Sequence, residues 1–214
     1  GVCGSRRQPY TGWNSFSGYP EREPVTGGLC ADPWVGSGLA MVTAAALNSR
    51  ALTGQGQYVD FSMAEALNAS IPEALLDYQM NGRVKEPMGN RDDWYAPHGV
   101  YHCSGADRWV AIPVTNDEEW VSLCQVIGRP ELASDPRYAE AAGRRDHQGP
   151  LDAAITEWTL QHEDVNAMQL LQQVGVPSGP SQDIFRVFNE PPLSEAGYFT
   201  KLPTRSRVLR DRPG

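Results

Sequence analysis

The sequence lacks several features that would assign it to common protein classes. It has four cysteines in 214 residues and no CxxC pair, so neither a disulfide framework nor a zinc site is expected. No apolar run reaches about 18 residues, which excludes a conventional membrane-spanning helix. The first residues have no basic start followed by an apolar run, so no signal peptide is visible. These absences favour a cytoplasmic protein with reduced cysteines and no bound metal.

What the sequence does contain is an acidic, globular composition. Hydrophobic residues make up 40% and charged residues 21%, and the formal net charge is −8. Basic residues gather after position 200, so the rest of the chain is more acidic still. A body of this charge is a poor partner for a phosphate backbone, and nucleic-acid binding is not expected. The overall charge does not argue against a local basic pocket for one small anion.

The first third of the chain predicts helices with very little strand. Residues 1–31 are irregular and rich in Gly, Pro and Ser, which suggests the continuation of a longer chain. Asp32 caps, and Pro33 opens, a predicted helix that ends near Arg50 and is apolar on almost every side, so we expect it to be buried all round. A short strand over 58–61 and a helix over 62–81 follow, with Pro72 kinking that helix or dividing it in two.

The rest of the chain predicts a smaller α+β unit over about 85–190. Its first element is a hairpin with strands at 100–103 and 109–114, and a capping box at 115–118 then opens a helix that ends before Gly128. Further helical segments are predicted at about 138–147, 150–162, 163–174 and 183–188, and a final strand at 198–202. The fold class is α/β, but the first third has too few strands for a sheet of its own, which indicates that its sheet lies elsewhere.

Asp32 is the strongest candidate for chemistry. A helix N-terminus favours a carboxylate and can stabilise a developing oxyanion, and neighbouring glycines, including Gly36 and Gly38, would let a substrate approach the backbone. From the residues alone, a simple N-cap role explains Asp32 as well. A dinucleotide site is not supported, because Met41 stands where GxGxxG needs its last glycine. His98 and His102 do not share a helical face, so a metal site is not expected there.

One run of the chain is distinctive enough to suggest a family. An aspartate precedes a glycine and a small-residue helix, and TGQGQYVDFSMAEA follows at residues 53–66. Further on come Gly89-Asn90, WVAIPV at 109–114, LASDPRY at 132–138 and GVPSGP at 175–180. Together these motifs resemble the class III CoA-transferases, the family of carnitine and bile-acid CoA-transferases, formyl-CoA transferase and α-methylacyl-CoA racemase. The resemblance runs from about residue 18 to 202.

The resemblance implies an acyl-CoA:carboxylate CoA-transferase with Asp32 as nucleophile, reacting through an aspartyl anhydride and an aspartyl thioester. It implies that Gly36, Gly38, Gly89 and Asn90 contact the substrate or CoA. An acyl-CoA and a carboxylic acid would be the substrates, and no cofactor would be permanently bound. Two alternatives stay open: a non-catalytic fragment, or a racemase. The racemase branch uses a histidine upstream of the aspartate, which residues 1–31 lack, and a glutamate near the position of Asn116, so it is less favoured than the transferase.

The resemblance also implies a domain plan and a partner. Residues 1–84 would be part of a Rossmann-like large domain with its connecting helix, 85–190 the small domain, and 191–214 a return segment with the basic tail. Family chains are about twice as long as this one, so the sequence corresponds to an interior or C-terminal portion. The family forms interlocked dimers, so we expect either a homodimer or pairing with a separate N-terminal subunit.

Overall fold

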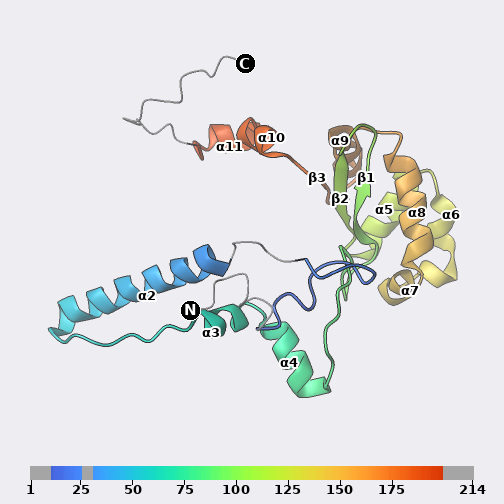
Figure 1. Ribbon diagram of the computed structural model, residues 1–214. Helices are drawn as coiled ribbons and strands as arrows, with labels where there is room; N and C mark the ends of the chain where they lie inside the picture. The colour runs from blue at the N-terminus through green and yellow to red at the C-terminus, as the bar shows by residue number, and fades with distance from the viewer. Residues whose placement is uncertain (1–10, 26–30, 200–214) are drawn as a thin grey trace, which may run out of the picture. The chain divides into compact units, whose positions relative to one another are not determined.

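The computed structural model describes residues 11–25 and 31–199, and these form two compact units, Gly1–Asp92 and Asp93–Gly214 (Figure 1). Helix and strand labels follow Figure 1. The described elements are mixed helix and strand, as predicted, with one small antiparallel sheet of three strands. That sheet belongs to the second unit. Among the described residues, no helix has both the length and the apolar character needed to cross a membrane.

The first unit contains three described helices: α2 (Ala31–Thr53), α3 (Met63–Asn68) and α4 (Pro72–Asn81). Pro72 divides the predicted 62–81 helix in two, because its ring occupies the first turn of α4. Ser62 caps α3 by accepting a hydrogen bond from the Glu65 N–H, and Gly82 ends α4 with a left-handed φ of 68°. The capping signals in the sequence are thus confirmed at both ends.

One expectation for the first unit is wrong. Residues 58–61 form no strand, since no neighbouring strand in the described part of the chain pairs with them. The expected burial of α2 on every side concerns association with another chain, and within this chain only Ala31 and Val35 of the helix are buried. These two residues pack with Leu67 of α3 in a cluster that Phe61, Met63 and Ala66 extend.

The second unit is built on the sheet order β1-β2-β3, where β1 is His98–His102, β2 is Trp109–Pro113 and β3 is Gly179–Pro180. The hairpin prediction is confirmed: β1 and β2 pair antiparallel with Tyr101 opposite Val110. β3 lies in a stretch that reads as a loop in the sequence, because it is only two residues long and contains proline. It pairs with β2 by placing Pro180 opposite Val110.

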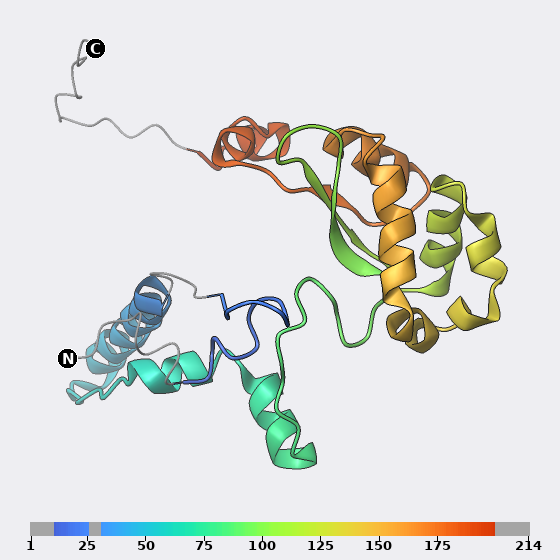
Figure 2. The same ribbon diagram turned by 45° about the vertical axis from the view of Figure 1, so that its right-hand side comes forward.

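Most helices of the second unit cover one face of this sheet (Figures 1 and 2). The helical elements on this side of the sheet are α5 (Asp117–Val126), α6 (Pro130–Ser134), the 3-10 turn η1 (Pro136–Tyr138), α7 (Ala141–Asp146), α8 (Gln148–Thr159) and α9 (Asp164–Gln173). Two short helices, α10 (Ile184–Phe188) and α11 (Pro191–Glu195), follow β3 and lie apart from the hydrophobic core. α6, η1 and α11 are absent from the prediction, since each begins at a proline and spans only three to five residues. The expected strand at 198–202 does not form at 198–199, and its remaining residues lie outside the described part.

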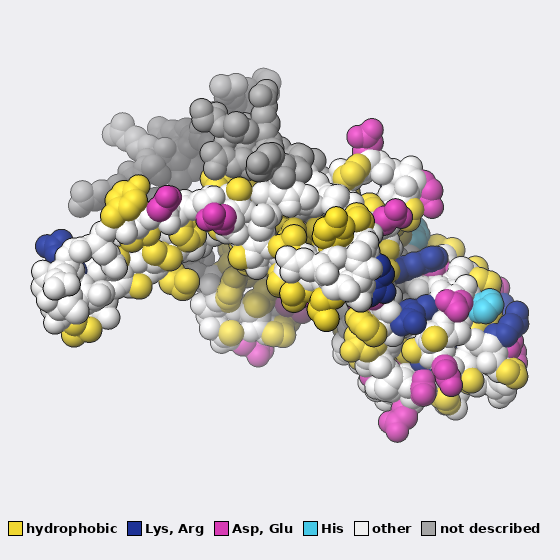
Figure 3. Space-filling view, turned by 90° about the horizontal axis from the view of Figure 1, so that it is seen from below, with side chains coloured by type: hydrophobic (Ala, Val, Ile, Leu, Met, Phe, Trp, Pro, Cys, Tyr) yellow, Lys and Arg dark blue, Asp and Glu magenta, His cyan; other side chains and the backbone are white. Residues whose placement is uncertain are grey.

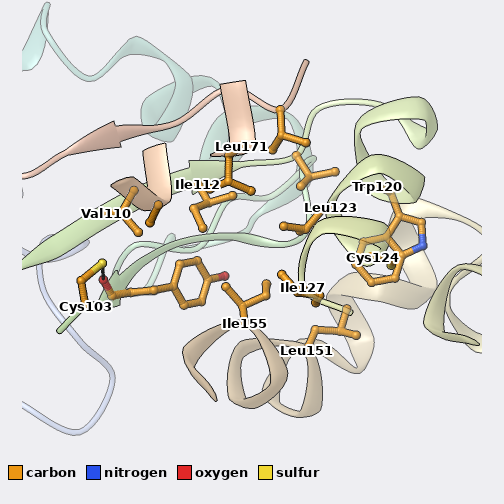
Figure 4. Packing of buried hydrophobic residues seen from close by; sticks show 14 of the residues in the cluster. Cys103, Val110, Ile112, Trp120, Leu123, Cys124, Ile127, Leu151, Ile155 and Leu171 are labelled. Carbon is orange, nitrogen blue, oxygen red and sulfur yellow. Dashed lines mark hydrogen bonds between the residues drawn. The ribbon is translucent and has the colours of Figure 1, made fainter. Parts of the chain in front are cut away.

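A continuous hydrophobic core lies between the sheet and these helices (Figure 4). Val110 and Ile112 point from β2 toward Leu123 of α5, Ile155 of α8 and Leu171 of α9, and all five are fully buried or nearly so. The free thiols of Cys103 and Cys124 belong to the same core. Burial raises the pKa of Cys103 to about 11 and that of Cys124 to about 12, so neither thiol is a ready nucleophile.

Arg144 fixes the edge of this core by reaching inward from α7. Its guanidinium is buried and donates to the carbonyl oxygens of Ala96 (2.8 Å) and Tyr138 (3.0 Å) and to Asp117 Oδ1 (2.8 Å). It also lies over the indole of Trp120, 5.5 Å from the ring centroid. A buried charge needs such a full set of partners, so Arg144 is a structural residue that joins four segments of the second unit.

Candidate active site

The predicted nucleophile lies in the first turn of α2. The helix begins at Ala31, two residues earlier than expected, so Asp32 is inside the first turn rather than at the N-cap. Its side chain is exposed. The 23 residues of α2 give its N-terminus an appreciable partial positive charge, which favours an anion at this position. Asp32 is therefore held where an anion is stabilised and where a substrate can reach it.

The two predicted glycines of α2 differ in their surroundings. A Cβ at Gly36 would meet nothing within 4 Å, so this face of the helix is open. A Cβ at Gly38 would lie 3.1 Å from Cζ of Phe61, so Gly38 permits the close approach of the 58–62 segment. Gly38 thus has a packing role, whereas Gly36 leaves space at the surface just beyond Asp32.

A groove of about 640 Å³ runs between α2, α3 and the segment that joins them. Its apolar walls include Trp34, Met41 and Phe61, and its charged groups are Asp60 and Glu65. The remaining lining residues are small or apolar: Val35, Ser37, Gly38, Ser62, Ala66, Ala69 and Ser70. Asp32 does not itself line this groove, but Trp34 and Val35 of the same first turns do.

The other two predicted residues lie in a second cavity of the same unit. Gly89 and Asn90 line a space of about 540 Å³ together with Trp13, Tyr19 and Ser70. Gly89 has a left-handed φ of 66°, and the Asn90 Nδ2 donates to the Tyr19 hydroxyl at 2.9 Å. The sequence motif thus marks a folded loop that faces a cavity.

Ser70, at the junction of α3 and α4, lines both cavities. Its Oγ accepts a hydrogen bond from Trp13 Nε1 at 3.1 Å and donates to the Leu67 carbonyl at 2.6 Å. This junction anchors the N-terminal segment against the helices. All five predicted site residues therefore lie in the first unit, with Asp32, Gly36 and Gly38 on α2 and Gly89 and Asn90 at the second cavity.

Sequence reasoning missed three residues that shape these cavities. Trp13, Tyr19 and Ser70 are named by no motif, although aromatic residues beside glycines in the irregular 11–25 segment were a usable signal. The described residues hold no group of three or more His, Cys, Asp or Glu side chains that could bind a metal. The chemistry available in the first unit is that of a carboxylate at a helix N-terminus beside apolar cavities.

Comparison with known proteins adds relatives of defined activity. The chain is 33% identical over 181 residues to the succinyl-CoA–D-citramalate CoA-transferase of Chloroflexus aurantiacus, covering 82% of this chain and 44% of that protein. It is 30% identical over 190 residues to the acetyl-CoA:oxalate CoA-transferase of Acetobacter aceti, covering 86% of this chain and 47% of that one. The chain therefore spans about half the length of these curated relatives.

A solved structure agrees with the sequence relatives. A CaiB/BaiF family protein from Brucella suis superposes with a TM-score of 0.81 and 29% identity, over 89% of this chain and 50% of that one. The family model for CoA-transferase family III matches residues 4–210, which is nearly the whole sequence. The resemblance first indicated by the motifs around Asp32 is thus confirmed, and the chain belongs to CoA-transferase family III.

Proposed function

We propose that this chain carries the nucleophile of an acyl-CoA:carboxylate CoA-transferase, and that the nucleophile is Asp32. The observation that carries the proposal is the position of Asp32 in the first turn of α2, within the family match. It is exposed and lies where the helix favours negative charge. A carboxylate is a modest nucleophile, but a thioester carbonyl is reactive enough for it to attack.

In the donor half-reaction, an Asp32 carboxylate oxygen attacks the thioester carbonyl of the acyl-CoA. The carbon–sulfur bond breaks, leaving a mixed anhydride of the acyl group with Asp32 and a CoA thiolate. The thiolate then attacks the Asp32 carbonyl of the anhydride, which gives an aspartyl-CoA thioester and releases the donor acid as its carboxylate. No proton or electron is gained or lost in these steps.

In the acceptor half-reaction, the carboxylate of the second acid attacks the aspartyl thioester and expels the CoA thiolate. The new mixed anhydride joins the acceptor acid to Asp32. Attack of the thiolate on the acceptor carbonyl forms the new acyl-CoA and restores the Asp32 carboxylate. CoA is therefore a substrate carried between acids, and the chemistry needs no resident cofactor.

The N-terminus of α2 would supply electrostatic stabilisation in each step. Every addition places negative charge on a carbonyl oxygen, and unpaired backbone N–H groups in the first turn of a helix are suited to receive it. The absence of a side chain at Gly36 leaves room for the substrate to approach that turn, since nothing lies within 4 Å of a Cβ built there.

The names of the relatives favour small dicarboxylic acids as substrates. D-citramalate and oxalate are both short acids with two carboxylates, and the succinyl donor belongs to a third. We therefore propose that the acceptor and donor acids of this chain are short dicarboxylates. The second carboxylate of such a substrate would need a cation in the complete site.

The active form would include a second chain, and a second copy of this one fits best. α2 carries only Asp32 and Arg50 as charged residues along 23 positions, and Trp34, Leu39, Met41 and Leu47 are exposed on it. An apolar surface of this extent marks an interface. Pairing with a separate N-terminal subunit is the competing arrangement.

Replacing Asp32 by Asn tests the nucleophile. The substitution keeps the size of the side chain but replaces one carboxylate oxygen by an amide nitrogen and removes the negative charge, so CoA transfer from succinyl-CoA to a dicarboxylate should fall on the order of 10³-fold or more. Glu73→Gln is the matched control, because Glu73 is also an acidic residue in the first turn of a helix, α4. Transfer is measured by chromatography of the CoA thioesters in the purified assembly. Equal rates for the wild type and Asp32→Asn would overturn the assignment.

A further inference from the structure

Two glycines bring distant segments into direct contact in the first unit. Gly89 donates its backbone N–H to the carbonyl oxygen of Gly18 at 2.7 Å, although the two residues lie 71 positions apart. Both have backbone conformations that other residues rarely adopt, with φ of 116° at Gly18 and 66° at Gly89. The contact between the 11–25 segment and the 88–91 loop is therefore built into the backbone.

The ring of Tyr19 packs against Gly89, in the space that a side chain at residue 89 would occupy. A Cβ at Gly89 would lie 2.7 Å from both Cδ1 and Cε1 of Tyr19, closer than real carbon atoms approach. The Tyr19 hydroxyl in turn accepts a hydrogen bond from Asn90 Nδ2 at 2.9 Å. Tyr19 thus fixes the loop twice, through ring packing at residue 89 and through a hydrogen bond at residue 90.

The Asn90 carboxamide is held at a cavity whose wall carries no charge. Apart from Asn90, the residues around this space of about 540 Å³ are aromatic, aliphatic, small or hydroxyl-bearing. Two of them, Trp13 and Ser70, are hydrogen-bonded to each other. The nearby guanidinium of Arg22 lies over the Tyr19 ring, 5.8 Å from its centroid, but Arg22 does not line the cavity. An anionic group placed in the cavity would lose hydration and find no cation among the lining residues. A carboxamide, by contrast, can donate to and accept from an amide of an uncharged ligand.

We propose that Tyr19 is a positioning residue that holds Asn90 against the uncharged, amide-containing arm of the acyl-CoA substrate. The inference rests on the proposed function, because it needs a CoA thioester as substrate. It assigns the loop to the acyl-CoA rather than to the free acceptor acid, because a carboxylate would be desolvated there without a cation among the lining residues. Asn90 makes the contact, and Tyr19 acts through Asn90.

Tyr19→Phe is the sharpest test, because it keeps the ring over Gly89 and removes only the acceptor for Asn90. Loss of one hydrogen bond of this kind should raise the KM for acyl-CoA by roughly 3- to 10-fold. The kcat and the KM for the acceptor acid should stay within about twofold of wild type. Tyr78→Phe is the matched control: Tyr78 is exposed on α4, and its hydroxyl has no hydrogen-bond partner in the described part of the chain.

A double-variant cycle separates positioning from general stability. Once Asn90→Ala has removed the carboxamide, Tyr19→Phe should cost nothing further if Tyr19 acts only through Asn90. Additive losses, a rise in the acceptor KM instead of the acyl-CoA KM, or identical kinetics for Tyr19→Phe and Tyr78→Phe would each overturn the inference.

Binding of succinyl-CoA, measured by calorimetry on the same assembly, gives a reading that does not depend on turnover. The Kd should rise 3- to 10-fold in Tyr19→Phe, as estimated for one hydrogen bond. Transfer that survives Asp32→Asn would refute the nucleophile and leave this binding result intact. A wild-type assembly that does not bind the thioester would overturn the positioning of Asn90 as well.

Discussion

The two units of this chain differ in how much of their apolar surface they can bury. The second unit, Asp93–Gly214, has fifteen buried hydrophobic residues in one core cluster, packed between a sheet and its helices. The first unit, Gly1–Asp92, has a cluster of three among the residues that the structure describes, and several large side chains of α2 and α4 are exposed. Yet the first unit carries all five predicted site residues.

This difference suggests that the second unit folds around its own core, whereas the first unit offers an apolar surface to another chain or segment. Burial of apolar area is the main favourable term in folding, so the second unit has the core of an autonomous domain. The exposed apolar side chains on α2 and α4 of the first unit would gain that term only against another chain or segment. The catalytic proposal and the association proposal therefore concern the same stretch of sequence.

The largest expected effect is on association. We expect the purified chain to scatter light as a species of twice its 23.5 kDa mass or larger. A charge at Leu47, which is 58% exposed on α2, should abolish this association, because a carboxylate buried in an apolar interface without a partner is costly. The variant is Leu47→Glu.

Leu160→Glu is the control, since Leu160 is similarly exposed at the end of α8 in the second unit. It should leave the mass unchanged. A stable, soluble 23.5 kDa species formed by the wild type without a partner would contradict the association. Dissociation by Leu160→Glu alone would move the interface to the second unit.

The next effect concerns the cores themselves. Leu123→Ala removes a fully buried side chain from the second unit and should lower its unfolding free energy by about 3–5 kcal/mol. Leu67→Ala, in the small cluster of the first unit, should cost about 2 kcal/mol, because the open groove beside α3 lets the site relax. Residue-resolved hydrogen exchange on α8 and α4 reports the two units separately. Equal losses at both places would show one cooperative core.

The sequence predicted local structure best where the chain supplies its own partners. The hairpin of β1 and β2, the Ser62 cap and the Gly82 stop depend on residues a few positions apart, and all three are confirmed. The capping box at 115–118 is displaced by one residue: Asn116 caps α5, and Glu119 reaches back to the Thr115 N–H. Short-range hydrogen bonding explains this accuracy.

Features that need distant partners were missed. The 58–61 segment has strand propensity but nothing in the described chain pairs with it, so propensity alone was misleading. The contact of Tyr19 with Gly89 joins segments 70 residues apart, which no local pattern reveals. The resemblance to a family singled out Gly89 and Asn90 as candidates and supported Asp32, whereas the contacts of Tyr19 and Ser70 are visible only in the structure.

The smallest expected effect tests whether the second unit owes stability to one ion pair. Asp164, buried at the start of α9, pairs with Arg186 of α10 at 2.5 Å between Oδ2 and Nη1. Burial alone would raise the pKa of the Asp164 carboxyl, but hydrogen bonds from Arg186 and from the Val165 N–H outweigh it, so the pKa lies below its usual value. The pair joins the sheet-covering helix α9 to α10.

A carboxyl with a lowered pKa in the folded state stabilises the fold above the pKa of the unfolded chain, about 3.9. This contribution is lost as pH falls through the folded-state pKa. Asp164→Asn should therefore destabilise the second unit at pH 7, by about 1–3 kcal/mol, and the difference from wild type should shrink below about pH 4. Arg108 also lowers the pKa of Asp164, while Asp183 and Glu190 raise the pKa of Arg186. None of these three residues is substituted in the comparison.

Urea unfolding of the second unit at several pH values measures the predicted convergence. Glu157→Gln is the control, because it breaks the exposed pair with Arg129 and should change stability by less than about 1 kcal/mol. A difference between Asp164→Asn and wild type that is the same at pH 3 and pH 7 would mean that Asp164 stabilises α9 through its hydrogen bonds and not through its charge.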